Sequence, residues 1–339
     1  MRLRHSVHWW ECTDRATTAI AIGRSAGTVT FNQPISIANP NGSNDEAIGI
    51  SDSSGNVTFA AVTIDDTNRV TTGQPSINLG GNSNTVTFAS LDVTTNNGGG
   101  LRALNIANLT INGGTIDAMG APGIEINGAT AIDVTLQRVS SANTDDGIRI
   151  INADGRLSVT GDGTTPGSGG IISATDTGIY VQDSENVEFN FMTITSDQFG
   201  FASVNSNAVL LNQSMLTSSV DGWDGIRVLN TDLEKDGTPV VFTNNTVTGT
   251  GANQFGINIE NNLSPPGFAR VDANIVNLTG VGSVGLNITA TGNMPVSEPG
   301  DITVLSLENN LITAPTVTTS TETMATIFGQ LLINGTLFP

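Results

Sequence analysis

The acidic side chains between residues 143 and 176 are the best placed in this sequence to do chemistry. Asp145 and Asp146 stand directly before a glycine, and Asp176 stands two residues before the next comparable glycine. Carboxylates gathered in this way could supply part of the shell of a Ca²⁺ ion, which takes about six to eight oxygen ligands. Asp also stabilises turns by bonding to nearby backbone, so a purely structural role for these three residues stays open.

Four larger side chains complete the candidate site. Arg149, Tyr180 and Arg227 each follow a Gly-Ile pair, at a position where we expect the side chain to point outward. Trp223 stands between two aspartates. An exposed tryptophan ring could stack on a sugar, whereas a buried one would close the edge of the core. These four residues are the predicted substrate-binding set.

A short strand that begins after a glycine must position these residues. Glycine accepts positive φ, which frees the turn, and the residues after it alternate between inside and outside. Successive copies of the strand should therefore place Glu125, Arg149, Tyr180 and Arg227 in one outward column, with Asp145 and Asp176 about 5 Å apart on neighbouring coils. The motif occupies residues 123–126, 147–150, 178–181, 225–228, 256–259 and 285–288.

A second motif recurs at intervals of roughly 20 to 35 residues and predicts two strands joined by a one-residue bend. It begins at Val57, Val86, Leu104, Val187, Val209, Val240, Ala269 and Leu305. Asn245, Asn274 and Asn310 share one slot of this motif, where amides of successive coils can bond to one another. No unit can bury its apolar side alone, so the units must stack. The sequence therefore predicts an all-β, single-stranded parallel β-helix, a solenoid of roughly ten coils.

Gly-Ile-x-Ile followed by V-x-F-x-N-N-x-V, over roughly residues 50 to 315, resembles the repeat of the pectin-lyase-like superfamily. The resemblance implies a right-handed β-helix. The superfamily includes polysaccharide lyases, hydrolases and adhesin passengers that lack catalysis. The run from Asn143 to Gly147 is similar to the acid and base aspartates of polygalacturonase-like members, which would make Asp145, Asp146 and Asp176 catalytic. Arg149 or Arg227 matches by type the essential base of calcium-dependent lyases. The Gly-His-Gly and Arg-x-Lys of the hydrolases are absent.

The composition and net charge limit the kinds of partner that this chain can bind. The formal charge is −19, from 31 acidic and 12 basic residues. Phosphate backbones and anionic membranes repel such a chain, so we expect neither nucleic-acid binding nor membrane insertion. Cys12 is the single cysteine, which rules out an internal disulfide. The acidic, lysine-poor surface suits a secreted or cell-surface location, with calcium as the cofactor to test.

The chain divides into three regions. Residues 1–27 hold both histidines and lack the apolar run of a signal peptide, which predicts either a cap or a leader foreign to the fold. Residues 28–315 carry the repeats. Residues 316–339 lose the pattern and either cap the last coil or lead into further sequence. From residue 229 the loops lengthen, and insertions of this kind often build a binding face.

These observations favour a non-enzymatic structural or adhesion protein that presents an acidic repeat surface to a carbohydrate or another cell-surface ligand. The alternative is a lectin, a polysaccharide lyase or a glycoside hydrolase that acts on an anionic polysaccharide through the face between residues 143 and 227. The arrangement of the outward residues separates the two, because an enzyme needs them to converge in a groove. The sequence leaves the oligomeric state open.

Overall fold

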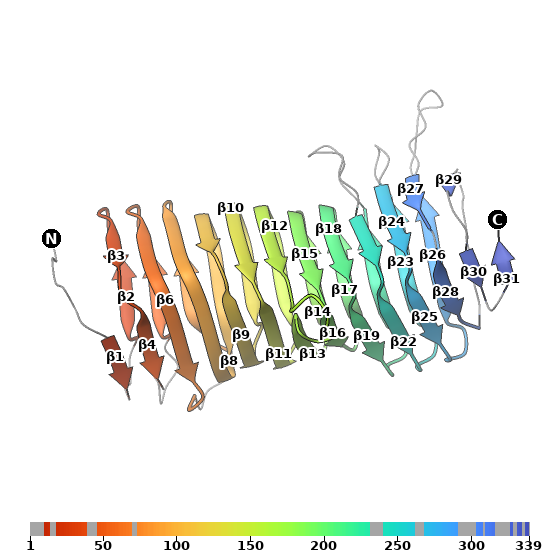
Figure 1. Ribbon diagram of the computed structural model, residues 1–339, viewed down its shortest axis with the longest axis horizontal. Helices are drawn as coiled ribbons and strands as arrows, with labels where there is room; N and C mark the ends of the chain where they lie inside the picture. The colour runs from red at the N-terminus through yellow and green to blue at the C-terminus, as the bar shows by residue number, and fades with distance from the viewer. Residues whose placement is uncertain are drawn as a thin grey trace, which may run out of the picture.

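The protein is a solenoid in which the coils follow one another along the long axis, as the computed structural model in Figure 1 shows. The structure describes residues 10–13, 18–38, 46–69, 73–230, 240–261, 268–290, 303–307, 309–315, 326–327, 331–333 and 336–338. Within these residues all regular structure is β-strand, and the chain forms a right-handed parallel β-helix of about nine turns. The predicted fold class is confirmed. No described helix is long and apolar enough to cross a membrane.

Three parallel sheets run the length of the solenoid. The first contains β2 (Ile20–Gly23), β5 (Ile48–Ser51), β7 (Pro75–Gly80), β14 (Thr177–Gln182), β17 (Phe199–Val204), β20 (Asp224–Leu229), β23 (Phe255–Asn261) and β26 (Val284–Ala290). The second contains β3 (Val29–Phe31), β15 (Glu185–Asn190), β18 (Asn207–Asn212), β21 (Val240–Thr243), β24 (Phe268–Asp272), β27 (Thr303–Ser306) and β29 (Thr326–Ile327).

The third sheet contains β1 (Trp10–Thr13), β4 (Ile35–Ala38), β9 (Gly114–Gly120), β11 (Arg138–Thr144), β13 (Gly170–Ala174), β16 (Met192–Thr195), β19 (Met215–Ser218), β22 (Thr246–Gly249), β25 (Ile275–Leu278), β28 (Asn310–Thr313) and β30 (Leu331–Ile333). A last strand, β31 (Thr336–Phe338), turns back and pairs with β30 in antiparallel fashion. Four strands continue from one sheet into another: β6 (Val57–Asp66), β10 (Ile124–Leu136) and β12 (Ile148–Val159) each cover two sheets, and β8 (Thr85–Ile111) passes through all three.

The Gly-Ile motif forms the first sheet, but its glycine serves another purpose than the predicted one. Gly147 and Gly178 are not among the glycines with positive φ. They are needed because the backbone passes close to its neighbours: a Cβ on Gly147 would lie 2.3 Å from Ile172 Cγ2 and 2.5 Å from the carbonyl oxygen of Gly178. Close packing between coils therefore selects glycine at this position.

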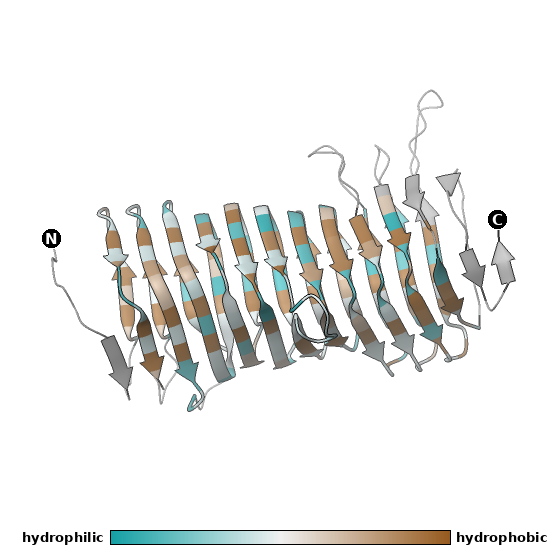
Figure 2. Ribbon diagram, in the orientation of Figure 1, coloured by the Kyte–Doolittle hydropathy of each residue, from teal (hydrophilic) through white to brown (hydrophobic). Residues whose placement is uncertain are grey.

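The apolar positions of both motifs point into one continuous core, and Figure 2 shows hydrophobic and hydrophilic residues alternating along the strands. Phe31, Phe59 and Phe88 stack on one another with ring centroids 4.8 and 4.9 Å apart. The spacing follows from the distance between hydrogen-bonded parallel strands, about 4.8 Å. Identical residues one coil apart thus reinforce the register.

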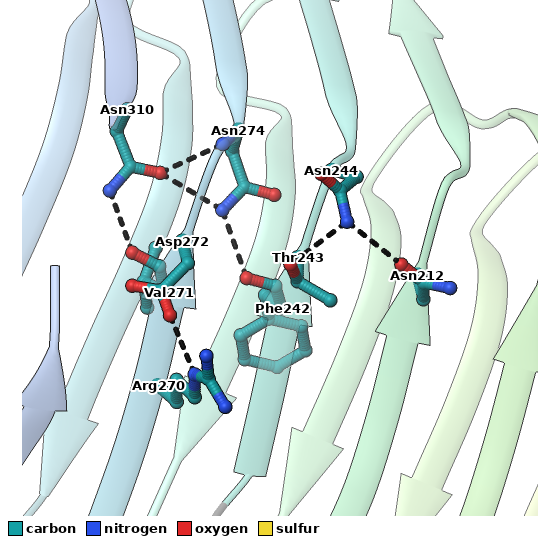
Figure 3. A network of polar contacts seen from close by, with 9 residues as sticks. All are labelled: Asn212, Phe242, Thr243, Asn244, Arg270, Val271, Asp272, Asn274 and Asn310. Carbon is teal, nitrogen blue, oxygen red and sulfur yellow. Dashed lines mark hydrogen bonds and ion pairs between the residues drawn. The ribbon is translucent and has the colours of Figure 1, made fainter. Parts of the chain in front are cut away.

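The predicted asparagine ladder is confirmed, and Figure 3 shows its step from Asn274 to Asn310. Asn245 Nδ2 donates to Asn274 Oδ1 at 3.0 Å, and Asn274 Nδ2 donates to Asn310 Oδ1 at 3.0 Å. Each amide also donates to a main-chain carbonyl of the preceding coil, in Asn274 to that of Phe242 at 2.9 Å. All three side chains are buried, so the ladder satisfies polar groups where the second sheet bends into the third.

Two register assignments and one boundary differ from the prediction. Leu104 was predicted to begin a second-motif strand, but it lies in the first sheet, paired with Gly80. The strand β8 continues through the bend without a break, so the spacing does not mark where the sheet changes. Ala269 pairs with Val304 rather than Leu305, next to an irregularity in β24. Pairing also extends upstream of residue 28, since β2 is in register with β5. The predicted binding loops at residues 231–239, 262–267 and 291–302 and most of the region 316–339 lie outside the described residues.

Candidate functional site

The predicted outward column on the first sheet is present. Arg149 lies in register with Glu125 on one side and Tyr180 on the other. The column continues through Ala202 to Arg227, so Arg227 stands two coils beyond Tyr180. Three of the predicted substrate-binding residues therefore share one wall of the solenoid, because the Gly-Ile-x-Ile register places every x side chain on the same outer face.

Part of the predicted site lines a single hollow of about 670 Å³ at the turn between β11 and β12. Asp145, Asp146 and Arg149 line it together with Glu125 and Asn143. The remaining wall comes from Gly73, Gly120, Ala121, Pro122, Thr144 and Thr175. Asp176, Tyr180, Trp223 and Arg227 do not line this hollow, so the predicted set is divided between the hollow and the wall beyond it.

Arg149 is the positive charge of the hollow and lies between two acids. Its Nη1 atom is 3.7 Å from Glu125 Oε1, and its Nε atom is 3.6 Å from Asp146 Oδ2. Burial raises the pKa of Asp146 above 3.8, the charge of Arg149 opposes this, and the charges of Asp176 and Asp145 raise the pKa further. Asp146 therefore accepts a proton more readily than a solvated aspartate.

The turn residues are bonded within and between coils, as the structural alternative requires. Thr144 Oγ1 donates to the carbonyl of Asp146 at 2.7 Å, and Thr175 Oγ1 donates to Asp145 Oδ1 at 3.2 Å. The main-chain N–H of Asp176 donates to the carbonyl of Asp145 at 3.0 Å, which confirms that the two turns are neighbours. Asp145 thus ties its own coil to the next one.

Calcium binding by Asp145, Asp146 and Asp176 stays a prediction. Within the part of the chain that the structure describes, no three carboxylate, histidine or cysteine side chains gather closely enough to hold a metal ion. The charges of Asp145 and Asp176 both act on Asp146. One oxygen of Asp176, Oδ1, is buried and lacks a hydrogen-bond partner, which adds to the negative field around Asp146.

The predicted sugar-stacking role of Trp223 is wrong, because its side chain is 0% exposed. Its Nε1 atom donates to Ser196 Oγ at 3.0 Å, also a buried side chain. The ring lies against two glycines of the first sheet, 3.2 Å from a Cβ built on Gly200 and 3.3 Å from one on Gly225. Trp223 instead closes the edge of the core, which was the predicted alternative to sugar stacking.

Arg227 belongs to a polar network that the sequence did not reveal. Its guanidinium contacts the buried Asp224 at 3.1 Å and Glu260 at 3.5 Å, and it lies 5.4 Å from the ring centroid of Phe199. Asn258 Nδ2 donates to both acids, at 3.1 Å each. Burial raises the pKa of Asp224, and the hydrogen bond from Asn258 opposes this. The sequence signal for this network was Asn258, the residue in the x position of the next Gly-Ile motif.

Tyr180 is also engaged by its own wall. Its hydroxyl donates to Gln182 Oε1 at 2.7 Å, and Gln182 Nε2 donates in turn to Asp183 Oδ2 at 2.8 Å. Burial raises the pKa of the Tyr180 phenol, while the nearby charge of Arg149 opposes this. The phenol therefore stays protonated at neutral pH.

A fully buried ion pair lies in the turn after β6 and was not predicted. Arg69 Nε donates to Asp66 Oδ2 at 2.7 Å, and both side chains are 0% exposed. Ser76 Oγ donates to the same oxygen at 3.2 Å, and Arg69 Nη1 donates to the carbonyl of Gln74 at 3.1 Å. The pair joins the end of one coil to the first-sheet strand of the next. It lies in a turn that does not repeat, so no periodic signal marks it.

The chain matches no protein-family model, no curated protein and no solved structure.

Proposed function

We propose that this protein is a non-enzymatic β-helical structural protein, secreted or displayed at a cell surface, that acts by contact. One observation carries the proposal: the charged residues of the outer wall are engaged with one another across coils. Arg149 lies between Glu125 and Asp146, and Arg227 lies between Asp224 and Glu260. Side chains occupied in this way stabilise a wall, whereas a catalytic centre needs them directed at a substrate.

The inside of the solenoid supports the same function. The stacked phenylalanines and the asparagine ladder repeat the same contacts from coil to coil, so each coil holds its neighbours in register. Parallel pairing along three sheets then makes the molecule a stiff rod with a long outer surface. A rod of this kind suits reach and presentation, and its acidic wall is the surface offered to a ligand.

The contact function is tested by binding of the full chain to immobilised glycans and whole cells. We expect binding that survives the substitutions Asp145→Asn and Asp146→Asn, because the proposed surface is the extended wall and not one pair of carboxylates. Loss of binding in both variants, with the fold intact by circular dichroism, would place the activity in the hollow and overturn the proposal.

The second candidate is a lectin or lyase of the pectin-lyase-like superfamily, to which the repeat motif points. The hollow favours it, because it combines a partly exposed arginine with an aspartate of raised pKa. A guanidinium is well suited to bind the carboxylate of an acidic sugar. Under this candidate the variant Arg149→Gln binds pectate or alginate at least tenfold more weakly in calorimetry, with Arg156→Gln, on the second sheet, as the matched control. Equal binding by both variants would remove it.

A further inference from the structure

The outer face of the third sheet changes character along the rod. In the earlier coils its outward positions include Asp65, Asp92, Asp117 and Arg138. On β19, β22, β25 and β28 the outward residues are all uncharged. We call these eight residues the uncharged face: Met215, Thr217, Thr246, Thr248, Ile275, Asn277, Leu311 and Thr313.

The uncharged face is built of two columns in strict register. Met215, Thr246, Ile275 and Leu311 lie side by side in the first column. Thr217, Thr248, Asn277 and Thr313 form the second. Met215 and Ile275 are each 40% exposed and Leu311 is 39% exposed, so three large apolar side chains stand on one flat strip of sheet.

We propose that the uncharged face docks a second copy of this chain. Two rods that each carry a formal charge of −19 repel one another over most of their surface. Contact is least opposed where neither rod presents a charge, and clustered exposed apolar side chains mark interaction sites. The face combines both properties, and the first sheet does not, since its outward column includes Glu125, Arg149 and Arg227.

Symmetry then fixes the arrangement. A twofold axis along the strands sets the apolar column of one rod against the apolar column of its antiparallel partner. Met215 then faces Leu311 of the second copy, and Thr246 faces Ile275. Two sheets that pack face to face lie about 10 Å apart, a gap that such side chains fill. The two copies therefore bury uncharged side chains against uncharged side chains without bringing acids together.

The size of the face sets the strength of the association. Four coils of about 4.8 Å and two outward positions of about 6.6 Å give roughly 250 Å² per copy, or about 500 Å² in total. The two preceding coils, with Ile171, Ser173, Thr193 and Thr195, continue the uncharged strip outside this contact. The total lies below the roughly 1,200 Å² of stable complexes, so we infer a weak and reversible dimer.

Sedimentation velocity of the full chain tests this, from about 10 µM to about 1 mM protein, a range suited to weak association. We expect the mean sedimentation coefficient to rise with concentration, and to rise further in about 0.5 M salt, which screens the repulsion between rods. The variants Met215→Glu and Ile275→Glu should remain monomeric throughout. Both substitutions are outward-facing, and the thermal unfolding of each variant reports whether the fold is kept.

Met119→Glu is the matched control, because Met119 is 42% exposed on the same sheet but lies two coils before Ile171. It should associate like the unaltered chain. Three results would contradict the proposal: no concentration dependence in the unaltered chain, association that persists in both face variants, or equal loss of association in Met119→Glu. Any of the three would overturn the proposed face.

Orientation is tested with a short bismaleimide in the Cys12→Ser background. A mixture of Met215→Cys and Leu311→Cys chains should give more covalent dimer than either chain alone, because these positions face each other only across antiparallel copies. Cross-linking that is strongest within each single variant would contradict the antiparallel arrangement.

Discussion

Asn274 donates its side-chain N–H to Asn310 Oδ1 at 3.0 Å, and the same oxygen accepts the main-chain N–H of Asn274 at 2.9 Å. One amide oxygen thus fixes both the side chain and the backbone of the preceding coil at its bend. Asn274 Oδ1 does the same for Asn245. The ladder is therefore a continuous restraint on the register of three coils, in a place where an unsatisfied polar group would be buried.

The variant Asn274→Ala should lower the free energy of unfolding by about 2 to 4 kcal/mol, because it leaves several buried polar groups of neighbouring coils without partners. Urea denaturation followed by circular dichroism measures this. Asn244→Gly is the matched control: Asn244 is exposed, its side chain bonds to Asn212 and Thr243 in Figure 3, and glycine accepts its φ of 57°, so the loss should cost less than about 1 kcal/mol. Equal costs at the two positions would show that the ladder adds no stability.

Asp146 should titrate above 3.8, since burial and the neighbouring acids raise its pKa. The variant Arg149→Gln removes the opposing positive charge and should raise the pKa further, while Asp145→Asn removes a like charge and should lower it. The folded pKa lies above the unfolded one, so this group favours the folded state most below about pH 4 and loses that contribution as pH rises through the folded value. Carboxyl ¹³C titration by NMR follows the residue directly. A lowered pKa of Asp146 in Arg149→Gln, or a raised one in Asp145→Asn, would contradict the geometry of the hollow.

The buried pair of Arg69 and Asp66 should behave as one unit. Arg69→Ala leaves a buried carboxylate without its cation and should destabilise the protein by about 3 to 5 kcal/mol at neutral pH. Because burial raises the pKa of Asp66, protonation relieves part of this cost, so the defect should shrink as pH falls toward 4. The partly exposed pair of Arg138 and Asp117 is the control, and Arg138→Ala should cost less than about 1 kcal/mol. Similar costs for the two substitutions at neutral pH would contradict this.

Trp223 should report on the core and ignore ligands. The variant Trp223→Phe removes the hydrogen bond to Ser196 and part of the buried ring, and should cost about 1 to 3 kcal/mol in unfolding free energy. The difference between the emission spectra of the unaltered chain and the variant isolates the Trp223 signal. That signal should resist quenching by acrylamide and stay constant when any glycan is added. A glycan-dependent change would mean that the ring is accessible.

The fold could be predicted because the solenoid repeats its apolar spacing and its asparagine slot, and each repeat adds evidence for the same register. The proximity of Asp145, Asp146 and Arg149 followed from that register, since all three precede or begin one first-sheet strand. Trp223 could not be placed in this way, because it stands in the turn before the strand, where inside and outside no longer alternate. Asp66 and Arg69 meet within a turn that occurs once, and Asn258 and Glu260 act on Arg227 only through the pairing of β20 with β23.

The reason for the motif glycines also lay beyond the sequence. A glycine before a strand suggests positive φ, yet at Gly178 the constraint is a 2.3 Å approach of Ile194 Cγ2 to a built Cβ. Such a contact depends on how tightly successive coils are wound. The same holds for Leu104, whose spacing fits the second motif although the chain has not yet reached the second sheet there.

The central claim, that the outer wall acts by contact and not by catalysis, is tested most directly by the chain length of anionic polysaccharides over time. Pectate and alginate are incubated with the full chain, with calcium and with chelator, and are followed by size-exclusion chromatography with light scattering. We predict that polymer length stays unchanged under every condition while the protein remains folded. Shortening that disappears in Asp146→Asn but persists in Asp133→Asn, a substitution on the second sheet, would contradict the claim and locate an active site in the hollow.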